Sequence, residues 1–474
     1  MILIVVLDGL RPDLVTPEQM PWLSRTAAGG VFCEHSHAVF PTATRINSAA
    51  LATGCRPGRH GIVGNELYAR AVDPLKAISC ADHRALLAMA AAEGGRLVSV
   101  PTLAERLREA GRSMVAVGSG SPGTTFLLDP TQAGAVVNWA AAWPEATQDE
   151  VVHRWGAMLD ESSDSLERTR FVERALTEYL LPTFRPDVAV FWVTEPDHAQ
   201  HHAGLGVPES VEMLGTVDAW LEGLVERLEA EYPGALDLIV TSDHGFSTVT
   251  NHVSLREERE MIEAALPISL EPGDLVFAGN GLYLNGQARE YLPEIREALG
   301  ARPWVGGLFV RDDLVECCPG ALPQSAVGGG AHRRSPEILY SGAWSAEANA
   351  QGVPGLVENP SGSVATHGMA SPFDVRNTLI ARGPSFKAGA VSPAPCGIVD
   401  IAPTVLHLLG VPAEGLDGRL LEEILRDGPA PAEVPIVRTH LRGRLGAGRD
   451  AIVEYSESRG HRYMDRVSTQ GEAE

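Results

Sequence analysis

The 474-residue sequence is short of positive charge. It contains 38 Lys and Arg residues against 61 Asp and Glu residues, which gives a formal net charge of −23. A surface this acidic repels nucleic-acid phosphates and anionic lipid headgroups. We therefore expect neither a nucleic-acid duplex nor a membrane among its partners. A small phosphorylated substrate remains compatible with this charge, because bound metal ions reverse the local field at a site.

Long apolar runs and cysteine frameworks are missing as well. Asp8 ends the apolar run at residues 1–7, whereas a membrane-spanning helix needs about 20 apolar residues. The run has neither the basic region nor the cleavage site of a signal peptide. The six cysteines form no CxxC pair, which is typical of ordinary thiols in a reducing compartment. These absences predict a cytoplasmic protein that relies on an apolar core and not on disulfides.

The sequence does contain an alternation of short apolar runs and amphipathic stretches, which is typical of an α/β fold. The runs are rich in β-branched residues and show little polar alternation, as expected of a mostly parallel sheet flanked by helices. We predict strands at residues 2–7, 113–117, 187–193, 236–241 and 377–381. We predict helices at residues 102–110, 171–180, 209–230 and 400–409.

Composition divides the chain into a core and two additions. Residues 247–366 combine weak periodicity with many isolated Gly and Pro residues, which predicts an inserted, cap-like subdomain. Residues 1–246 and 367–425 would then form the catalytic α/β core. Residues 426–474 would form a C-terminal extension, which opens on a Pro/Ala linker and carries a predicted edge strand at 451–455.

Acidic residues follow two of the predicted strands directly. Asp8 follows the first strand, and Asp243 and His244 follow the strand at 236–241. Open α/β sheets bind their ligands at such strand ends, although a turn or a helix cap also explains Asp8 taken alone. Neighbouring side chains of an extended chain point to opposite faces, but Gly245 permits a bend that would bring Asp243 and His244 together. A catalytic dyad is the alternative for this pair, but no GxSxG motif accompanies it.

A histidine-rich segment follows the strand at 187–193. Asp197 and His201 are four residues apart, so on a helix both reach one face and can share a cation. His198 and His202 form a second pair of this kind on a neighbouring face. His367 stands alone before Gly368, and taken by itself it is best interpreted as structural.

A hydroxyl-rich segment precedes a short predicted helix that Gly54 ends. A hydroxyl in this position either caps the helix or acts as a nucleophile, because a helix N-terminus favours phosphate. A threonine hydroxyl such as that of Thr44 is a poor nucleophile at neutral pH, and no base adjoins it in the sequence. Metal coordination would have to activate it.

Together these segments supply three carboxylates, three imidazoles and one hydroxyl. The set is Asp8, Asp197, Asp243, His201, His244, His367 and Thr44. Divided between two ions, it leaves coordination positions for a substrate. Mixed oxygen and nitrogen ligation predicts two Zn²⁺ ions, with Mn²⁺ or Fe²⁺ as alternatives.

The order of these motifs resembles the alkaline phosphatase superfamily, and most of all its nucleotide pyrophosphatase/phosphodiesterase (type I phosphodiesterase) branch. The similarity runs from residue 2 to residue 425. The motifs are Asp8, Pro41-Thr42-x-Thr44-x-x-Asn47, His60-Gly61-Ile62-Val63-Gly64-Asn65, Asp197-x-x-x-His201, Asp243-His244-Gly245 and Thr366-His367-Gly368. The fold that this resemblance implies is alkaline-phosphatase-like, with metals along the C-terminal edge of a mostly parallel sheet.

The resemblance also implies a role for each residue. One zinc ion would be held by Asp197, His201 and His367, and the other by Asp8, Asp243, His244 and the oxygen of Thr44. Asn47 would donate its amide to a phosphate oxygen. Thr44 would attack phosphorus and form a phosphothreonine intermediate, which a water then hydrolyses.

The residues after the nucleophile depart from the branch. Arg45, Ile46 and Ser48 stand where it carries a base-stacking aromatic residue, a proline and a histidine. Arg45 is expected to bind a second anionic group of the substrate, to lie over a base or to face solvent. A sulfatase is disfavoured, because the segment lacks the C/S-x-P-x-R pattern.

The sequence thus predicts a di-zinc hydrolase of phosphodiester or nucleotide pyrophosphate bonds that acts on a small phosphorylated substrate. A phosphonoacetate-hydrolase-like enzyme that cleaves a C–P bond is the first alternative, since there a carboxylate-binding cation replaces the base-stacking residue. A phosphate monoesterase and a non-catalytic metal-binding protein are the others.

Overall fold

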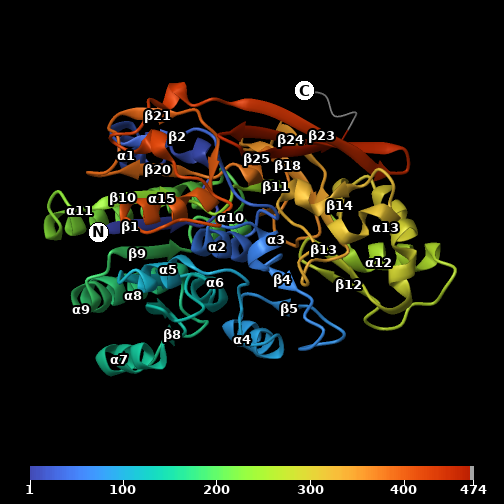
Figure 1. Ribbon diagram of the computed structural model, residues 1–474, viewed down its shortest axis with the longest axis horizontal. Helices are drawn as coiled ribbons and strands as arrows, with labels where there is room; N and C mark the ends of the chain where they lie inside the picture. Colours follow the sequence, from blue (N-terminus) through green and yellow to red (C-terminus); the bar gives the residue numbers. More distant parts are fainter. Residues whose placement is uncertain (470–474) are drawn as a thin grey trace.

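Residues 1–469, which the computed structural model describes, fold around a central sheet of nine strands (Figure 1). The strand order is β21-β2-β20-β10-β1-β9-β6-β7-β8. Their bounds are Ile2–Leu7 (β1), Val31–Cys33 (β2), Met114–Gly118 (β6), Ala135–Asn138 (β7), Ala142–Trp143 (β8), Val188–Val193 (β9), Asp237–Thr241 (β10), Leu379–Arg382 (β20) and Ala390–Ser392 (β21). Strands β10, β1, β9, β6 and β7 are parallel to one another, whereas β20 is antiparallel to β10 and β8 to β7. The predicted α/β class with a mostly parallel sheet is confirmed.

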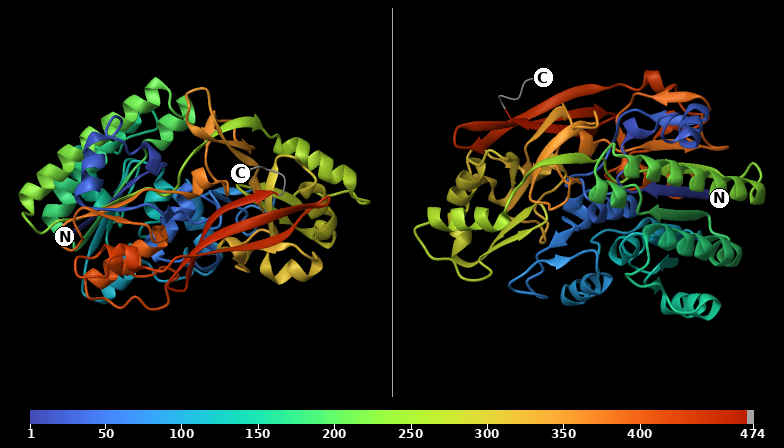
Figure 2. Two further views of the ribbon diagram at one scale, coloured as in Figure 1. Left: turned by 90° about the horizontal axis from the view of Figure 1, so that it is seen from above. Right: turned by 180° about the vertical axis from the view of Figure 1, so that it is seen from behind.

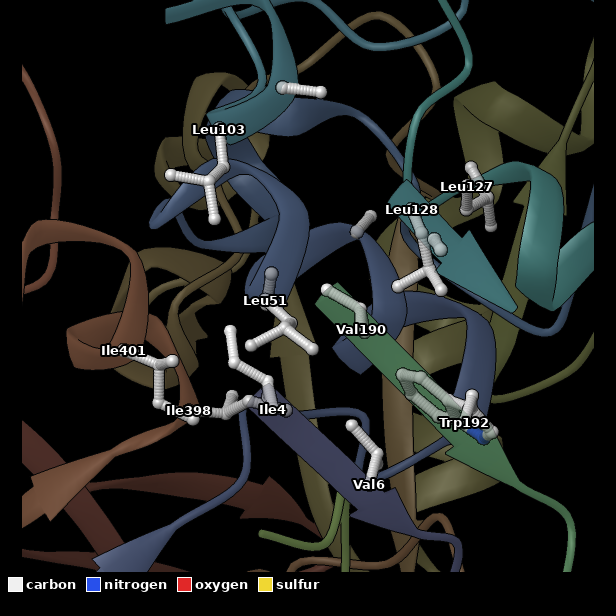
Figure 3. Close-up of a cluster of buried hydrophobic side chains, with 14 of the residues drawn as sticks. Ile4, Val6, Leu51, Leu103, Leu127, Leu128, Val190, Trp192, Ile398 and Ile401 are labelled. Carbon is white, nitrogen blue, oxygen red and sulfur yellow. The ribbon is translucent and has the colours of Figure 1, made fainter. Parts of the chain in front are cut away.

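The central strands are buried on both faces. In β1, Ile4 and Val6 belong to one apolar core, and Leu3, Val5 and Leu7 belong to the other. Figure 3 shows part of the first core, where Ile4 and Val6 lie between Leu51, Ile398 and Val190. Two apolar faces explain why these strands lack polar alternation in the sequence. Each predicted strand is present, with small shifts at its ends.

Helices cover both faces of the sheet. Side chains of α2, α5 and α15 lie in the first core, and side chains of α1, α8 and α11 lie in the second. The bounds are Pro21–Gly29 (α1), Thr44–Thr53 (α2), Pro57–His60 (α3), His83–Ala92 (α4), Leu103–Glu109 (α5), Pro122–Phe126 (α6), Glu145–Trp155 (α7), Ser165–Ala175 (α8), Leu181–Phe184 (α9), Asp197–Ala203 (α10), Pro208–Glu231 (α11), Pro372–Val375 (α14) and Ile401–Leu408 (α15). The predicted helices at 102–110, 209–230 and 400–409 are confirmed. The helix predicted at 171–180 begins earlier, because Asp164 caps α8 by accepting a hydrogen bond from the Glu167 N–H at 2.7 Å.

Residues 247–366 build most of a second lobe, drawn in yellow on the right of Figure 1, whose apolar core also contains residues of the C-terminal extension. It contains α12 (Leu255–Ala265) and α13 (Leu292–Gly300). Its strands are Ser247–His252 (β11), Leu275–Ala278 (β12), Gly281–Leu284 (β13), Val305–Val310 (β14), Leu322–Pro323 (β15), Ile338–Gly342 (β16), Trp344–Ala348 (β17), Pro354–Asn359 (β18) and Ala365–Thr366 (β19). They form two sheets, of order β17-β18-β11-β19 and β12-β13-β16-β14-β15. Short strands outside these sheets are Ser36–His37 (β3), Glu66–Leu67 (β4), Ile78–Ser79 (β5) and Cys396–Gly397 (β22).

The C-terminal extension forms a three-stranded sheet that lies over the second lobe (red in Figure 2). Its strands are Val437–Gly446 (β23), Arg449–Ser458 (β24) and His461–Thr469 (β25), and residues 470–474 of the predicted extension lie outside the described part of the chain. The prediction of an edge strand at 451–455 is wrong. These residues lie in β24, which pairs with β23 on one side and β25 on the other. The alternate residues Ala451, Val453 and Tyr455 are buried in the core of the second lobe.

Strand β25 also joins the extension to the central sheet's loops. Asp465 accepts a hydrogen bond from His37 at 2.9 Å, and the Tyr463 hydroxyl donates to Asp400 at 2.8 Å. The Val467 N–H donates to the carbonyl of Ala370 at 2.9 Å. Within residues 1–469, no helix has both the length and the apolar character required to span a bilayer.

Candidate metal and phosphate-binding site

Loops after three neighbouring strands meet at one edge of the central sheet. Asp8 follows β1, Asp197 begins α10 after β9, and Asp243 follows β10. The loops are hydrogen-bonded to one another: the Asp197 N–H donates to the carbonyl of Asp8 at 3.0 Å. The Gly9 N–H donates to Asp243 Oδ1, also at 3.0 Å. The fold therefore holds these carboxylates together at the C-terminal ends of parallel strands, as the sequence predicted.

Gly245 allows the chain to turn sharply after β10. A Cβ atom at this position would lie 1.9 Å from the carbonyl oxygen of Phe373. Only glycine permits this approach of the two backbones. Asp243 and His244 can then both contribute to the site, with His244 Nε2 3.1 Å from Asp243 Oδ2.

Thr44 lies next to a first group of ligands. His244 Nε2 lies 3.5 Å from Asp8 Oδ1 and 3.3 Å from Thr44 Oγ, and Asp243 Oδ2 borders the same nitrogen. All of these residues are buried. Four potential ligand atoms therefore surround one position in the interior.

Asp197 is the centre of a second group. Its Oδ1 lies 3.4 Å from His201 Nε2 and 3.5 Å from His367 Nε2. The two groups adjoin, because the rings of His244 and His367 stack with centroids 3.6 Å apart. All seven residues predicted as ligands thus lie close together in the structure. The ligand atoms of Asp8, Asp243 and His244 form one compact group, those of Asp197, His244 and His367 form another, and His201 adjoins Asp197.

The three imidazoles are oriented by backbone carbonyls. The Nδ1–H groups of His201, His244 and His367 donate to the carbonyls of Ala365, Gly245 and Thr42, each at 2.9 Å. The proton is thereby fixed on Nδ1, and the Nε2 lone pair of each ring is left facing the carboxylates. This arrangement is typical of metal-binding histidines.

Three buried carboxylate oxygens lack a partner among the described residues, and they face the imidazole nitrogens. They are Asp8 Oδ1, Asp197 Oδ1 and Asp243 Oδ2. The other oxygen of Asp8 accepts from Trp192 Nε1 at 2.9 Å, so the carboxylate is held in place. An unsatisfied buried oxygen costs about 1–3 kcal/mol, and more when charged. The donor set therefore fits two cations.

The charges in the site perturb one another strongly. Burial, followed by repulsion from Asp243 and Asp197, raises the pKa of Asp8 well above its usual range. Burial opposes ionisation of Asp197 too, but His201 and His367 outweigh it and hold the pKa of Asp197 well below its usual range. Burial and the adjacent His244 lower the pKa of His367, so its imidazole is neutral and able to bind a metal.

Thr44 is the first residue of α2, and its hydroxyl is not used as a cap. The N-cap of α2 is Ala43, which has no side-chain hydrogen bond. The other candidate hydroxyl, Thr42, donates to the carbonyl of Met369 at 2.7 Å and accepts from the Gly368 N–H at 3.1 Å. Thr42 thus supports the loop that carries His367, and Thr44 is the hydroxyl that faces the ligands.

The prediction that Asn47 donates to phosphate is wrong. The side chain is fully buried, its Nδ2 donates to the carbonyls of Val39 and Ala43, and its Oδ1 accepts from the Val39 N–H at 2.8 Å. Both amide groups are therefore committed to the backbone that leads into α2. Asn47 positions the segment with Thr44 and does not face the site.

Asn65 takes the position that was expected of Asn47. It lines a cavity of about 470 Å³ together with Thr44, Asp197 and His367. Its Oδ1 accepts from the Arg45 N–H at 3.0 Å, which directs the amide nitrogen away from that backbone. The sequence motif at 60–65 contained this residue, but only the folded loops bring it to Thr44.

Two other predictions concern the rim of the site. Arg45 lines the same cavity as Thr44, and its Nη2 donates to Ser121 Oγ at 3.0 Å. The rings of His198 and His202 lie against each other, with centroids 4.4 Å apart and planes tilted by 47°. They lie on α10 outside both ligand groups.

Comparisons with known proteins identify the family of this chain. The profile of the family described as type I phosphodiesterase / nucleotide pyrophosphatase matches residues 2–299. Human ectonucleotide pyrophosphatase/phosphodiesterase family member 7 is 24% identical over 428 residues, which are 88% of this chain and 82% of that protein. Venom phosphodiesterase 2 of Crotalus adamanteus is 23% identical over 247 residues, which are 52% of this chain and 26% of that protein.

Solved structures share the fold. Murine ectonucleotide pyrophosphatase/phosphodiesterase 5, in an inactive threonine-to-alanine form in complex with AMP, matches with a TM-score of 0.63 at 19% identity, over 90% of this chain and 99% of that one. A mutant of the alkaline phosphatase PafA matches with a TM-score of 0.69 at 15% identity, over 90% of this chain and 98% of that one. The second of these matches shows that the fold is similar to that of an alkaline phosphatase. Since the family profile covers more than half of the chain, this chain belongs to the type I phosphodiesterase / nucleotide pyrophosphatase family and is a hydrolase of phosphoric esters.

Proposed function

We propose that this protein is a two-zinc hydrolase of phosphodiester or nucleotide pyrophosphate bonds, with Thr44 as its nucleophile. The observation that carries the proposal is the pair of adjoining ligand groups at Thr44, with three buried carboxylate oxygens that have no partner in residues 1–469. Buried carboxylates whose oxygens lack hydrogen-bond partners are expected where cations bind them.

Each ligand group would hold one ion. Asp197, His201 and His367 would hold the first, and Asp8, Asp243 and His244 would hold the second beside Thr44. Carboxylate and imidazole ligands of this mixture suit zinc. When bound, the two ions supply positive charge that lowers the pKa of a hydroxyl and neutralises phosphate oxygens.

Thr44 then displaces the leaving alcohol or phosphate from phosphorus. Its Oγ forms the new P–O bond while the bond to the leaving oxygen breaks, and the phosphoryl group is left on threonine. Water releases it in a second displacement of the same kind. Burial of Thr44 at the first turn of α2 keeps the hydroxyl away from bulk water and next to helix N–H groups that favour an anion.

Asn65 binds a non-bridging oxygen of the transferred phosphoryl group. Its amide nitrogen has no acceptor among the described residues, and its orientation is set by the hydrogen bond from the Arg45 N–H. A preoriented donor of this kind is most effective where charge develops in the transition state.

We expect Asn65→Ala to lower kcat by about 10²- to 10³-fold, as the loss of one such donor commonly does. The loss of thermal stability should be small, because the variant loses one hydrogen bond, from the Arg45 N–H to Oδ1, and the amide nitrogen has no acceptor within residues 1–469. Steady-state kinetics on bis(p-nitrophenyl) phosphate and a thermal melt measure the two effects.

Asn47→Ala is the matched control and should behave in the opposite way. It removes the partner of backbone groups in the buried segment before α2, which costs about 1–3 kcal/mol of unfolding free energy. A large loss of kcat without loss of stability in Asn47→Ala would contradict this assignment and indicate that Asn47 binds phosphate.

The substrate class is tested by a hydrolysis panel after zinc loading. The panel sets a p-nitrophenyl diester, the p-nitrophenyl monoester, a nucleotide pyrophosphate and phosphonoacetate side by side. The AMP complex of the murine relative supports nucleotides, whereas Arg45 beside the nucleophile keeps phosphonoacetate as the second candidate. Preference for a diester or a pyrophosphate supports the proposal, and turnover of phosphonoacetate alone contradicts it.

A further inference from the structure

A second cavity of about 780 Å³ lies beside the candidate site, among α4, α6 and α8 in the lower half of Figure 1. The linings of this cavity and of the cavity over Thr44 adjoin at Arg45 and Ser121, which form the boundary between them. Arg45 of the first cavity donates to Ser121 of the second at 3.0 Å. The two linings also meet where Glu66 pairs with Ser79 across β4 and β5. A substrate at Thr44 can therefore extend past Arg45 into this space.

Arg45 brings an uncompensated positive charge to the boundary. Its Nε is buried without a partner, and within residues 1–469 no carboxylate forms an ion pair with its guanidinium. Ser121, which accepts from Nη2, is neutral. Because a guanidinium stays charged at every physiological pH and binds planar anions through paired N–H groups, this group is suited to an anion of the substrate.

Two further arginines line the second cavity. Arg168 stacks on Trp139, with the guanidinium carbon 3.9 Å from the ring centroid, and donates from Nε to Ser163 Oγ at 3.1 Å. Arg84 lies exposed at the start of α4. Neither forms an ion pair with a carboxylate of the described chain. Arginines without acidic partners are notable in a protein with a net charge of −23.

The acidic residues of the same cavity do not cancel these charges. Asp82 is exposed and accepts from the Arg84 N–H as the N-cap of α4. Asp160 and Glu161 are exposed, and Asp160 accepts from the Ser162 N–H at 2.9 Å. All three carboxylates of the cavity therefore face solvent, whereas the boundary with the catalytic site is formed by Arg45.

We propose that this cavity binds a second anionic group, a carboxylate or a phosphate, on the substituent that stays attached to phosphorus. The inference rests on the proposed function. In-line displacement sends the leaving oxygen away from Thr44 Oγ, so the residue next to Thr44 meets the retained substituent. Arg45 binds the anion at the boundary, and Arg168 supplies charge deeper in the cavity.

Three p-nitrophenyl diesters with the same leaving group test this assignment. Their second substituents are butyl, 3-carboxypropyl and 3-phosphonopropyl, so they differ only in the distal charge. We expect kcat/KM of the zinc-loaded enzyme to be higher for one or both charged esters than for the butyl ester, by roughly 10- to 150-fold for one charge-assisted contact. A comparison of kcat/KM between the two charged esters shows whether the cavity prefers a carboxylate or a phosphate-like group.

Substitutions then assign the preference to residues. Arg45→Leu and Arg168→Leu should each reduce the ratio of charged to butyl kcat/KM, mainly through KM, and Arg45→Lys should recover part of it. Arg170→Ala is the matched control, since this arginine is exposed on the same helix as Arg168 but does not line the cavity. It should retain the wild-type ratio.

The outcomes separate this inference from the proposed function. Equal kcat/KM for all three esters overturns the inference and leaves the proposed function in place. Equal loss for charged and butyl esters in Arg45→Leu also overturns it, because Arg45 would then act on the transferred phosphoryl group. If the zinc-loaded enzyme cleaves none of the esters, both proposals fail.

Discussion

Thr44→Ala is expected to lower kcat for a phosphodiester by at least about 10³-fold, because loss of a nucleophile leaves only the electrostatic part of catalysis. The fold should be unaffected. Alanine is a better helix former than threonine, and within residues 1–469 the hydrogen-bonding neighbour of the Thr44 hydroxyl is His244 Nε2, at 3.3 Å. Steady-state turnover of zinc-loaded protein and a thermal melt check both parts.

Thr44→Ser is the matched control for this substitution. It keeps a hydroxyl at the first position of α2, so it should retain most of the turnover that Thr44→Ala loses. Acid quenching during turnover should trap the phosphoryl group on wild-type protein and not on Thr44→Ala. Near-normal activity in Thr44→Ala would show that a water, and not Thr44, attacks phosphorus. Thr42 would not replace it, since its hydroxyl is already hydrogen-bonded to the loop of His367.

Removal of the metals should abolish hydrolysis. We expect chelation to lower turnover by more than about 10³-fold, because the bound ions supply both activation of the hydroxyl and neutralisation of the phosphate. Adding zinc should restore activity, and elemental analysis should find about two ions per chain, one for each ligand group of three or four residues. Full activity in exhaustively chelated protein, or fewer than one ion per folded chain after zinc loading, would contradict this.

The metal-free protein should also become less stable as the pH rises. The raised pKa of Asp8 means that the folded state keeps a proton that the unfolded chain loses above about pH 3.9. The free energy of unfolding contributed by Asp8 falls as the pH rises, because the folded state binds more protons than the unfolded chain does. His201 and His244 act in the same direction: burial opposes their protonation, but Asp197 and Asp243 respectively outweigh it and raise both pKa values. The lowered pKa of His367 acts in the opposite direction, so three groups that bind protons in the folded state are set against one that releases a proton.

The measurable quantity is the difference in Tm between zinc-loaded and metal-free protein, which should widen from about pH 5 to pH 8. Asp8→Asn is the informative variant, because it removes one charge and keeps an oxygen for Trp192. It should raise the Tm of the metal-free protein and reduce the bound zinc to about one ion. A Tm difference that does not change with pH would contradict this prediction, because it would show that Asp8, His201 and His244 do not bind extra protons in the metal-free folded protein.

The sequence predicted the central sheet and the ligands for the same physical reason. Parallel strands buried on both faces leave uninterrupted apolar runs, and Asp8 and Asp243 come directly after such runs. Asp197 and His201 were predicted to share a cation from their spacing alone, because residues four apart lie on one face of a helix. The local pattern therefore contained both the strand and the ligand.

Asn47 and Asn65 show where local patterns fail. Asn47 shares a helix face with Thr44, so its spacing fitted a second contact with phosphate. In the folded chain the segment before α2 has unpaired backbone groups, and Asn47 satisfies them instead. Asn65 reaches the cavity only because its loop folds back on Arg45, a contact that no periodicity predicts.

The prediction of an edge strand at 451–455 failed for a related reason. Alternation at Ala451, Val453 and Tyr455 indicates one buried face, but it does not say how many neighbours a strand has. Its two partners, β23 and β25, contain many charged residues and produce no apolar run. Strands of this kind are recognised only from their pairing.

The hydrogen bond from Val467 to Ala370 has a consequence for biosynthesis. The chain is made from its N-terminus, so a nascent polypeptide that stops before β25 already carries every candidate metal ligand. It still lacks the strand that binds the His367 loop, together with the Asp465 partner of His37. The loop that carries His367 therefore gains this contact only after β25 has been synthesised and has paired with β24.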